Sequence, residues 1–195
     1  MFHLIKRLLA FIPEVEAHCD TADGPAVTDG RRALESGNLN HALKWIPADG
    51  EAELRHVFDL AVVVRTLGDQ AKEVADRLFL ETLVRIHRMA EGVGFTGIKG
   101  HDATVEPVVT AADRALETGD LEPLRALVPA DRFEELAHRF QHAREKRGFT
   151  VDDVRAGRDY IAAYVSYFKY AEGEDHEHGA DGHGAHAHRA HANHA

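Results

Sequence analysis

The chain lacks the features that would assign it to several common classes of protein. Cys19 is its only cysteine, so no intramolecular disulfide and no Cys-x-x-Cys zinc motif can form. The formal net charge of −10 leaves no basic stripe for nucleic acid. No apolar run approaches the roughly 18 residues that a membrane span needs. The 44% hydrophobic and 29% charged residues that remain predict a soluble globular protein.

The N-terminus carries a weak form of an export signal. Lys6 and Arg7 precede a short apolar stretch, residues 8–12, and residues 15–17 have the small-x-small form of a cleavage site. The stretch is shorter than the roughly 7–15 apolar residues of a secretory signal. We therefore expect an amphipathic first helix in a cytoplasmic protein. The alternative is an exported protein that is cleaved after Ala17.

The chain matches itself after a shift of 82 residues. Residues 25–58 and 107–140 are identical at 16 of 34 positions without a gap. After a slip of one residue, Ala-Glu-Gly at 90–92 recurs at 171–173. This similarity predicts a tandem duplication.

Each repeat has the signals of helices. Pro25 and Pro107 suit a first helical turn, and Gly37 and Gly119 suit the left-handed residue after a helix end. Further signals predict N-caps at Asp49 and Asp131 and long helices from about 69 to 90 and from about 151 to 171.

Alternation typical of strands is absent, so the fold class is predicted to be all-α. Each repeat of three to four helices is too small to bury its apolar faces alone, so the two should pack as one pseudo-symmetric helical domain. The expected organisation is an N-terminal helix or signal (1–17), repeat 1 (18–92), a linker (93–104), repeat 2 (105–172) and a disordered His-rich tail (173–195).

The C-terminal tail is rich in histidine. Seven of the fifteen histidines fall in its last twenty residues: His176, His178, His183, His186, His188, His191 and His194. Imidazole is a ligand for Ni, Zn and Cu, and a flexible chain can wrap such an ion without a preformed site. The tail therefore predicts binding of a divalent transition metal.

A second set of candidate ligands lies in the helix predicted over 69–90. His87 and Glu91 are four residues apart and share a helix face, so they could ligate one ion or position a proton, and Glu81 precedes them. The alternative is an ordinary helix surface. Charges of alternating sign recur every four residues from Glu73 to Arg85, and His87 falls at the edge of the apolar face.

His18-Cys19-Asp20 places three potential ligands side by side. Thiolate and imidazole together suit Ni, Cu or Zn. A His-Cys start resembles the metal hook of nickel superoxide dismutases, but that hook needs a second cysteine where this chain has Asp23. The alternative is that Cys19 is a small buried hydrophobic residue.

A Glu-x-x-His pair recurs in both repeats. Glu53 and His56 in the first repeat correspond to Glu135 and His138 in the second, and a duplicated pair is how di-iron carboxylate bundles build their site. The alternatives are a weak surface metal site formed by Glu135, His138 and His142, and a plain solvated polar face, because these three residues lie opposite the apolar positions of their helix.

Two blocks give the chain a family resemblance. The blocks are His18-Cys19-Asp20-Thr21 and Glu81-Thr82-Leu83-Val84-Arg85 with His87-Arg88. With these blocks, residues 17–172 resemble an uncharacterised bacterial family of unknown function. The resemblance implies an export signal before the first block and a histidine near the end of a tyrosine-rich last helix. That helix has no histidine here.

These observations favour a divalent transition-metal-binding protein that buffers, stores or delivers Ni, Zn or Cu. If the two blocks meet in space, His18, Cys19, Asp20, Glu81, His87 and Glu91 would form a mixed sulfur, nitrogen and oxygen site. The alternatives are a helical interaction module with a protein partner, and a metalloenzyme of unknown reaction centred on Glu81, His87 and Glu91.

Overall fold

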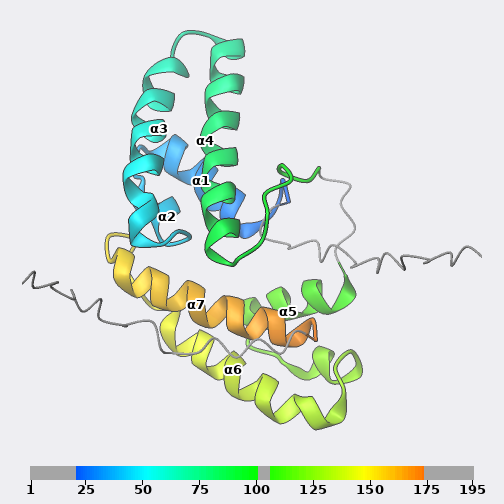
Figure 1. Cartoon of the computed structure of the whole chain (residues 1–195). Helices are drawn as coiled ribbons and strands as arrows, with labels where there is room; N and C mark the ends of the chain where they lie inside the picture. Colours follow the sequence, from blue (N-terminus) through cyan, green and yellow to red (C-terminus); the bar gives the residue numbers. More distant parts are fainter. Residues whose placement is uncertain (1–20, 101–105, 174–195) are drawn as a thin grey trace, which may run out of the picture.

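A computed structural model describes residues 21–100 and 106–173. Over these ranges the chain is all-α, as predicted, and none of the helices described is long and apolar enough to cross a membrane. The α-helices are α1 (Pro25–Ser36), α2 (Asn40–Leu43), α3 (Glu51–Val64), α4 (Asp69–Ala90), α5 (Pro107–Thr118), α6 (Phe133–Lys146) and α7 (Val154–Ala171) (Figure 1). The predictions for residues 1–20, for residues 101–105 and for the tail from residue 174 lie outside the described residues.

The helix boundaries follow the signals in the sequence at most ends. Helices α1 and α5 begin at Pro25 and Pro107. They end before Gly37 and Gly119, which have φ values of 72° and 82° and so occupy the left-handed region that favours glycine. Helix α4 has the predicted bounds, and α7 begins three residues later than predicted.

The prediction of N-caps at Asp49 and Asp131 is wrong. Each aspartate lies inside a short 3-10 helix, Ala48–Gly50 or Ala130–Arg132, that leads into α3 or α6. The residues at the cap positions are Gly50 and Arg132, and neither caps its helix with a side chain. The 3-10 turn moves the start of each long helix past the aspartate, so the sequence Pro-Ala-Asp here marks the turn before the helix.

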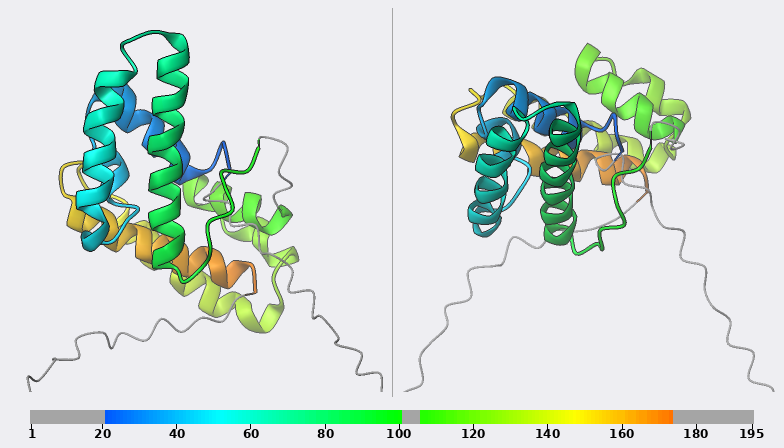
Figure 2. Two further views of the ribbon diagram at one scale, coloured as in Figure 1. Left: turned by 45° about the horizontal axis from the view of Figure 1, so that its top comes forward. Right: turned by 90° about the horizontal axis from the view of Figure 1, so that it is seen from above.

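The helices are arranged as two hairpins that cross. Helices α3 and α4 form a long hairpin, and α1 packs against it (Figures 1 and 2). Helix α7 runs beneath the base of this hairpin, with α6 packed along it and α5 at its far end. We call residues 21–92 the first half and residues 106–173 the second half. A hydrophobic core runs through both halves, from Val27 and Phe79 to Phe140 and Tyr167.

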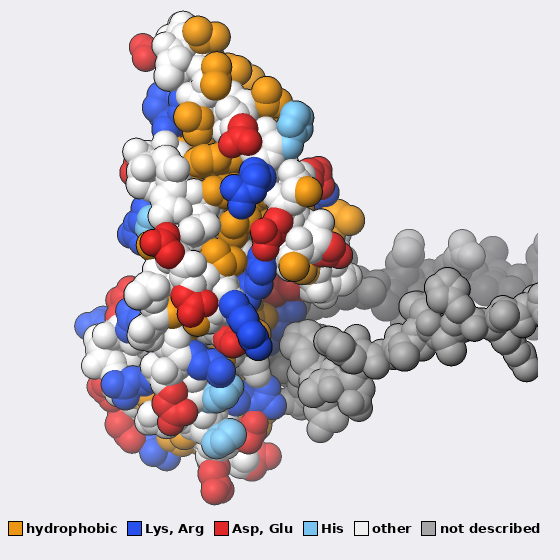
Figure 3. Space-filling model, turned by 90° about the vertical axis from the view of Figure 1, so that its left-hand side faces the viewer, with side chains coloured by type: hydrophobic (Ala, Val, Ile, Leu, Met, Phe, Trp, Pro, Cys, Tyr) orange, Lys and Arg blue, Asp and Glu red, His pale blue; other side chains and the backbone are white. Residues whose placement is uncertain are grey.

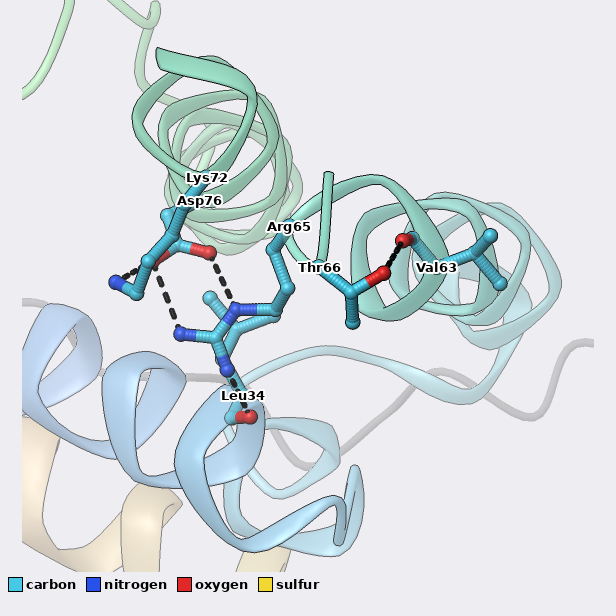
Figure 4. Close-up of polar contacts among 6 residues, drawn as sticks. All are labelled: Leu34, Val63, Arg65, Thr66, Lys72 and Asp76. Carbon is cyan, nitrogen blue, oxygen red and sulfur yellow. Dashed lines mark hydrogen bonds and ion pairs between the residues drawn. The ribbon is translucent and has the colours of Figure 1, made fainter. Parts of the chain in front are cut away.

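An arginine fixes the end of the first helix of each half. Arg65, directly after α3, donates to the carbonyl of Leu34 in α1 and pairs with Asp76 of α4 at 2.9 Å (Figure 4). Arg147, 82 residues later, donates to the carbonyl of Leu116 in α5. Both bonds satisfy a carbonyl near a helix end that has no partner within its own helix.

Polar contacts join the two halves at the base of the hairpin. Arg158 of α7 donates to the carbonyl of Ile46 at 2.8 Å and pairs with Glu51 at the start of α3. Close by, the side-chain amides of Asn38 and Asn40 donate to Asp152, in the turn before α7. These contacts place α7 against the segment that connects α1 to α3.

We predict that a valine at Gly30 destabilises the fold. A Cβ added at Gly30 would lie 2.6 Å from Leu80 Cδ2 and 2.8 Å from Leu83 Cδ2, and both leucines are buried. Gly30→Val should therefore lower the free energy of unfolding by about 1–3 kcal/mol, as measured by urea denaturation. Gly148→Val is the matched control, because an added Cβ there meets no atom within 4 Å. Equal stability of the two variants would contradict the close packing of α1 on α4.

Candidate functional site

His87 is buried at the end of α4, with only 3% of its surface exposed. Its Nδ1 lies 2.8 Å from the carbonyl oxygen of Trp45. Because a carbonyl only accepts hydrogen bonds, Nδ1 must carry a proton and donate it. The lone pair of the neutral ring is then on Nε2, which is buried and has no hydrogen-bond partner among the described residues. An imidazole in this state can bind a metal or accept a proton.

The carboxylate of Glu91 lies in front of this nitrogen. Its Oε2 is 3.9 Å from His87 Nε2 and 3.8 Å from Arg88 Nη1. Lys169 of α7 brings its Nζ to 3.8 Å from Oε1. Three basic side chains from two helices thus converge on one carboxylate, whose side chain is only 12% exposed. We call His87, Arg88, Glu91 and Lys169 the basic cluster.

Trp45 holds His87 in place. Its indole N–H donates to Asp29 Oδ2 of α1 at 2.9 Å. The indole meets the imidazole of His87 edge-on, with ring centres 5.6 Å apart, and meets the ring of Tyr164 in the same way at 6.1 Å. Trp45 is therefore fixed to α1, α4 and α7 together, and the direction of the Nε2 lone pair is set by the fold.

A cleft of about 310 Å³ lies on the other side of Trp45, between the two halves. Asp29 in this cleft is buried and accepts from Lys44 Nζ at 2.8 Å and from Arg32 Nη1 at 3.3 Å. The second half lines the cleft with Arg147, Phe149, Tyr160 and Tyr164, and burial raises the pKa of Tyr160. This charged and aromatic cleft could not be predicted from the sequence, because its residues come from segments more than 100 positions apart.

The structure brings together two of the predicted ligands and separates a third. His87 and Glu91 meet as their spacing predicted, but the placement of His87 at the boundary of the apolar face is wrong, because Trp45 covers it. Glu81 points elsewhere and pairs with Arg77 at 2.8 Å. Among the described residues, no three His, Cys, Asp or Glu side chains lie close enough to hold a metal. His18, Cys19, Asp20 and the seven tail histidines lie outside these residues.

The duplicated Glu-x-x-His pair faces solvent. Glu53 pairs with Arg85, and Glu135 pairs with Arg139 at 2.7 Å. His56 and His138 are exposed, as are Glu135 and His142. The interpretation of a solvated polar face is therefore confirmed, and the di-iron arrangement would need these side chains to point into a bundle core.

The second half has no counterpart of the His87–Trp45 pair. Trp45 corresponds to Leu127 at the shift of 82 residues. His87 lies after the one-residue slip, where the shift is 81, and so corresponds to Phe168. Phe168 is buried like His87, whereas Leu127 is 45% exposed. A phenylalanine therefore fills the equivalent buried position, and helix packing alone does not require a histidine there.

The chain belongs to DUF6448, a family of unknown function, whose family model matches residues 23–170. This agrees with the resemblance seen in the sequence, at the level of an uncharacterised family. No curated protein and no solved structure matches the chain.

We predict that the bond from His87 to Trp45 contributes to stability. His87→Phe keeps a ring at this position but removes the donor to a buried carbonyl, which should cost about 1–3 kcal/mol of unfolding free energy in a urea titration. His138→Phe, at an exposed position of α6, is the control and should change stability by less than about 0.5 kcal/mol. Equal effects of the two substitutions would show that the buried bond is not needed.

Proposed function

We propose that this protein binds a divalent transition metal, Ni, Zn or Cu, which it buffers, stores or delivers. In this proposal the histidines of the tail capture the ion, and His87 with Glu91 forms part of an internal site that receives it. The observation that carries the internal site is the buried Nε2 of His87, which has no partner among the described residues and lies 3.9 Å from a carboxylate oxygen.

The surroundings of His87 support this role. Histidines that ligate metals usually donate their second ring N–H to a carbonyl or carboxylate, which fixes the tautomer and the ring orientation. The bond from His87 Nδ1 to the Trp45 carbonyl is of this kind. A nitrogen and an oxygen ligand four residues apart on one helix can both reach the same ion.

The remaining ligands in this proposal come from His18, Cys19 and Asp20. They directly precede Thr21, which is buried and forms an isolated bridge with Lys99, and Ala22 donates to the Lys99 carbonyl at 2.8 Å. The start of the described chain is thus attached to the segment that follows α4. In this proposal the His-Cys-Asp block, which precedes this attachment, completes the site of His87 and Glu91.

The cations of the basic cluster favour a second candidate function. Arg88 and Lys169 lie beside Glu91, and cations repel a metal ion unless carboxylates balance them. The same cations could bind a small carboxylate or phosphate. A metalloenzyme centred on Glu81, His87 and Glu91 has less support, because Glu81 is paired with Arg77 away from the other two.

We predict that metal content separates the tail from the internal site. Three full-length proteins are purified without metal-affinity chromatography: the natural chain, a variant with all seven tail histidines changed to alanine, and that variant with His87→Phe added. Elemental analysis should find the most metal in the natural chain, about one equivalent in the tail variant, and almost none when His87 is also changed.

The matched control adds His138→Phe to the tail variant and should leave its metal content unchanged. A tail variant without metal would rule out the internal site and leave a tail that acts alone. A different outcome is that inorganic phosphate raises the melting temperature of the tail variant while no metal does so. If that increase were lost when Lys169 is changed, anion binding would replace metal binding as the proposed function of the basic cluster.

We also predict that binding depends on pH. A protonated imidazole cannot ligate, and histidine titrates near pH 6.5, so protons compete with the metal as the pH falls. Metal should be retained in dialysis at about pH 7.5 and released at about pH 5.5. Equal retention at the two pH values would contradict capture by imidazole.

A further inference from the structure

The outer part of the α3–α4 hairpin carries exposed hydrophobic side chains. Five of them, which we call the hairpin tip, are between 51 and 75% exposed: Leu60, Val63, Leu67, Val74 and Leu78. Figure 3 shows hydrophobic side chains gathered over this upper part of the molecule. Contiguous exposed apolar surface of this kind is typical of an interaction site.

Helix packing does not require these hydrophobic residues. The sequence repeat matches Leu60 and Val63 with His142 and Glu145, and it matches Val74 and Leu78 with Arg155 and Asp159. All four counterparts are exposed on the α6–α7 hairpin. The same positions are thus polar on one hairpin and apolar on the other, so the apolar residues of the tip serve something other than the hairpin itself.

The turn of the second hairpin shows what such a turn contacts. Leu67 corresponds to Phe149, which lies in the cleft between the halves together with Asp29 and Arg32 of α1. The ammonium of Lys44 lies 5.4 Å from the centre of the Phe149 ring. The turn of the second hairpin therefore packs on α1 and the segment after it in the first half.

The equivalent surface of the second half is open. A groove of about 750 Å³ follows α5 and the turn after it, and we call it the α5 groove. Its residues Ala111 and Pro123 correspond to Asp29 and His41 of the first half. Burial lowers the pKa of His41, which lies among the charges of Asp29, Arg32 and Lys44. The α5 groove thus lacks the carboxylate and the imidazole of the first half, although it keeps Arg114 as the counterpart of Arg32 and also contains Asp120.

We propose that the hairpin tip of one molecule docks into the α5 groove of a second copy. The contact would repeat between molecules the packing that the α6–α7 turn makes on α1 within one molecule, as stacked repeats do. Both surfaces differ from their counterparts in the same direction. Four tip residues are apolar where the second hairpin is polar, and the groove has Ala111 and Pro123 where the first half has Asp29 and His41. The contact joins two different surfaces, so each molecule can bind a neighbour on either side. An open assembly then has a free tip at one end and a free groove at the other, and a ring has neither.

This proposal does not depend on metal binding. The hairpin tip and the α5 groove contain none of the residues of the basic cluster. Neither surface contains a histidine or a cysteine, so the association is expected to occur in metal-free buffer with a chelator present.

Sedimentation velocity of the full chain over a wide concentration range tests the proposal. The natural protein should rise in mass from one chain, 21.6 kDa, to at least two chains. Leu67→Glu, which changes the most exposed tip residue, and Ala111→Glu, which changes the groove, should each weaken association at least about tenfold. Met89→Glu is the control, because Met89 is a 61% exposed residue of α4 outside the tip.

Mixing the two variants distinguishes this contact from other modes of association. The Leu67→Glu chain keeps its groove and the Ala111→Glu chain keeps its tip, so the mixture should form dimers and nothing larger. Circular dichroism of each variant checks folding, and Leu67→Gln and Ala111→Gln replace any variant that fails. A natural protein that stays monomeric at all concentrations would overturn the proposal. So would association of the Ala111→Glu chain alone, which would mean that tips bind tips.

Discussion

The hydrogen bond between His87 and the carbonyl of Trp45 joins the end of α4 to the segment between α2 and α3, and the candidate site depends on it. Trp45 is also held by Asp29 through its indole N–H and by Tyr164 through its ring edge. One residue outside the helices thus fixes α1, α4 and α7 together. Because the carbonyl sets the tautomer of His87, the same contact that orders the core also leaves the lone pair on Nε2, which lies 3.9 Å from Glu91 Oε2.

The two halves use similar helices for different purposes. The arginine bonds to the carbonyls of Leu34 and Leu116 recur at the same spacing, so this part of the packing is shared. The polar residues around Trp45 are not shared, because the second half has Phe168 and Ala111 where the first has His87 and Asp29. The first half therefore contains most of the candidate site, His87, Arg88 and Glu91. The second half contributes Lys169, which lies beside Glu91.

The sequence predicted the structural features that are set by residues close to one another along the chain. The bounds of α4, the prolines that begin α1 and α5, and the shared face of His87 and Glu91 all follow from local spacing. The burial of His87 could not be predicted, because its cover comes from Trp45, 42 residues earlier. Lys169 was missed for the same reason, since nothing in the sequence states that α7 crosses the end of α4. The aspartates before α3 and α6 were misread because a 3-10 turn and an N-cap begin with the same residues.

The two proposals rest on different physical forces, and this makes them separable. Binding by imidazole competes with protons, so it responds to pH and only weakly to salt. Docking of the apolar hairpin tip into the mostly apolar α5 groove should instead respond to salt and little to pH. The chains carry a net charge of −10 and repel one another, and added salt screens that repulsion while it leaves apolar burial intact. Self-association should therefore strengthen with ionic strength, whereas an interface built on ion pairs would weaken.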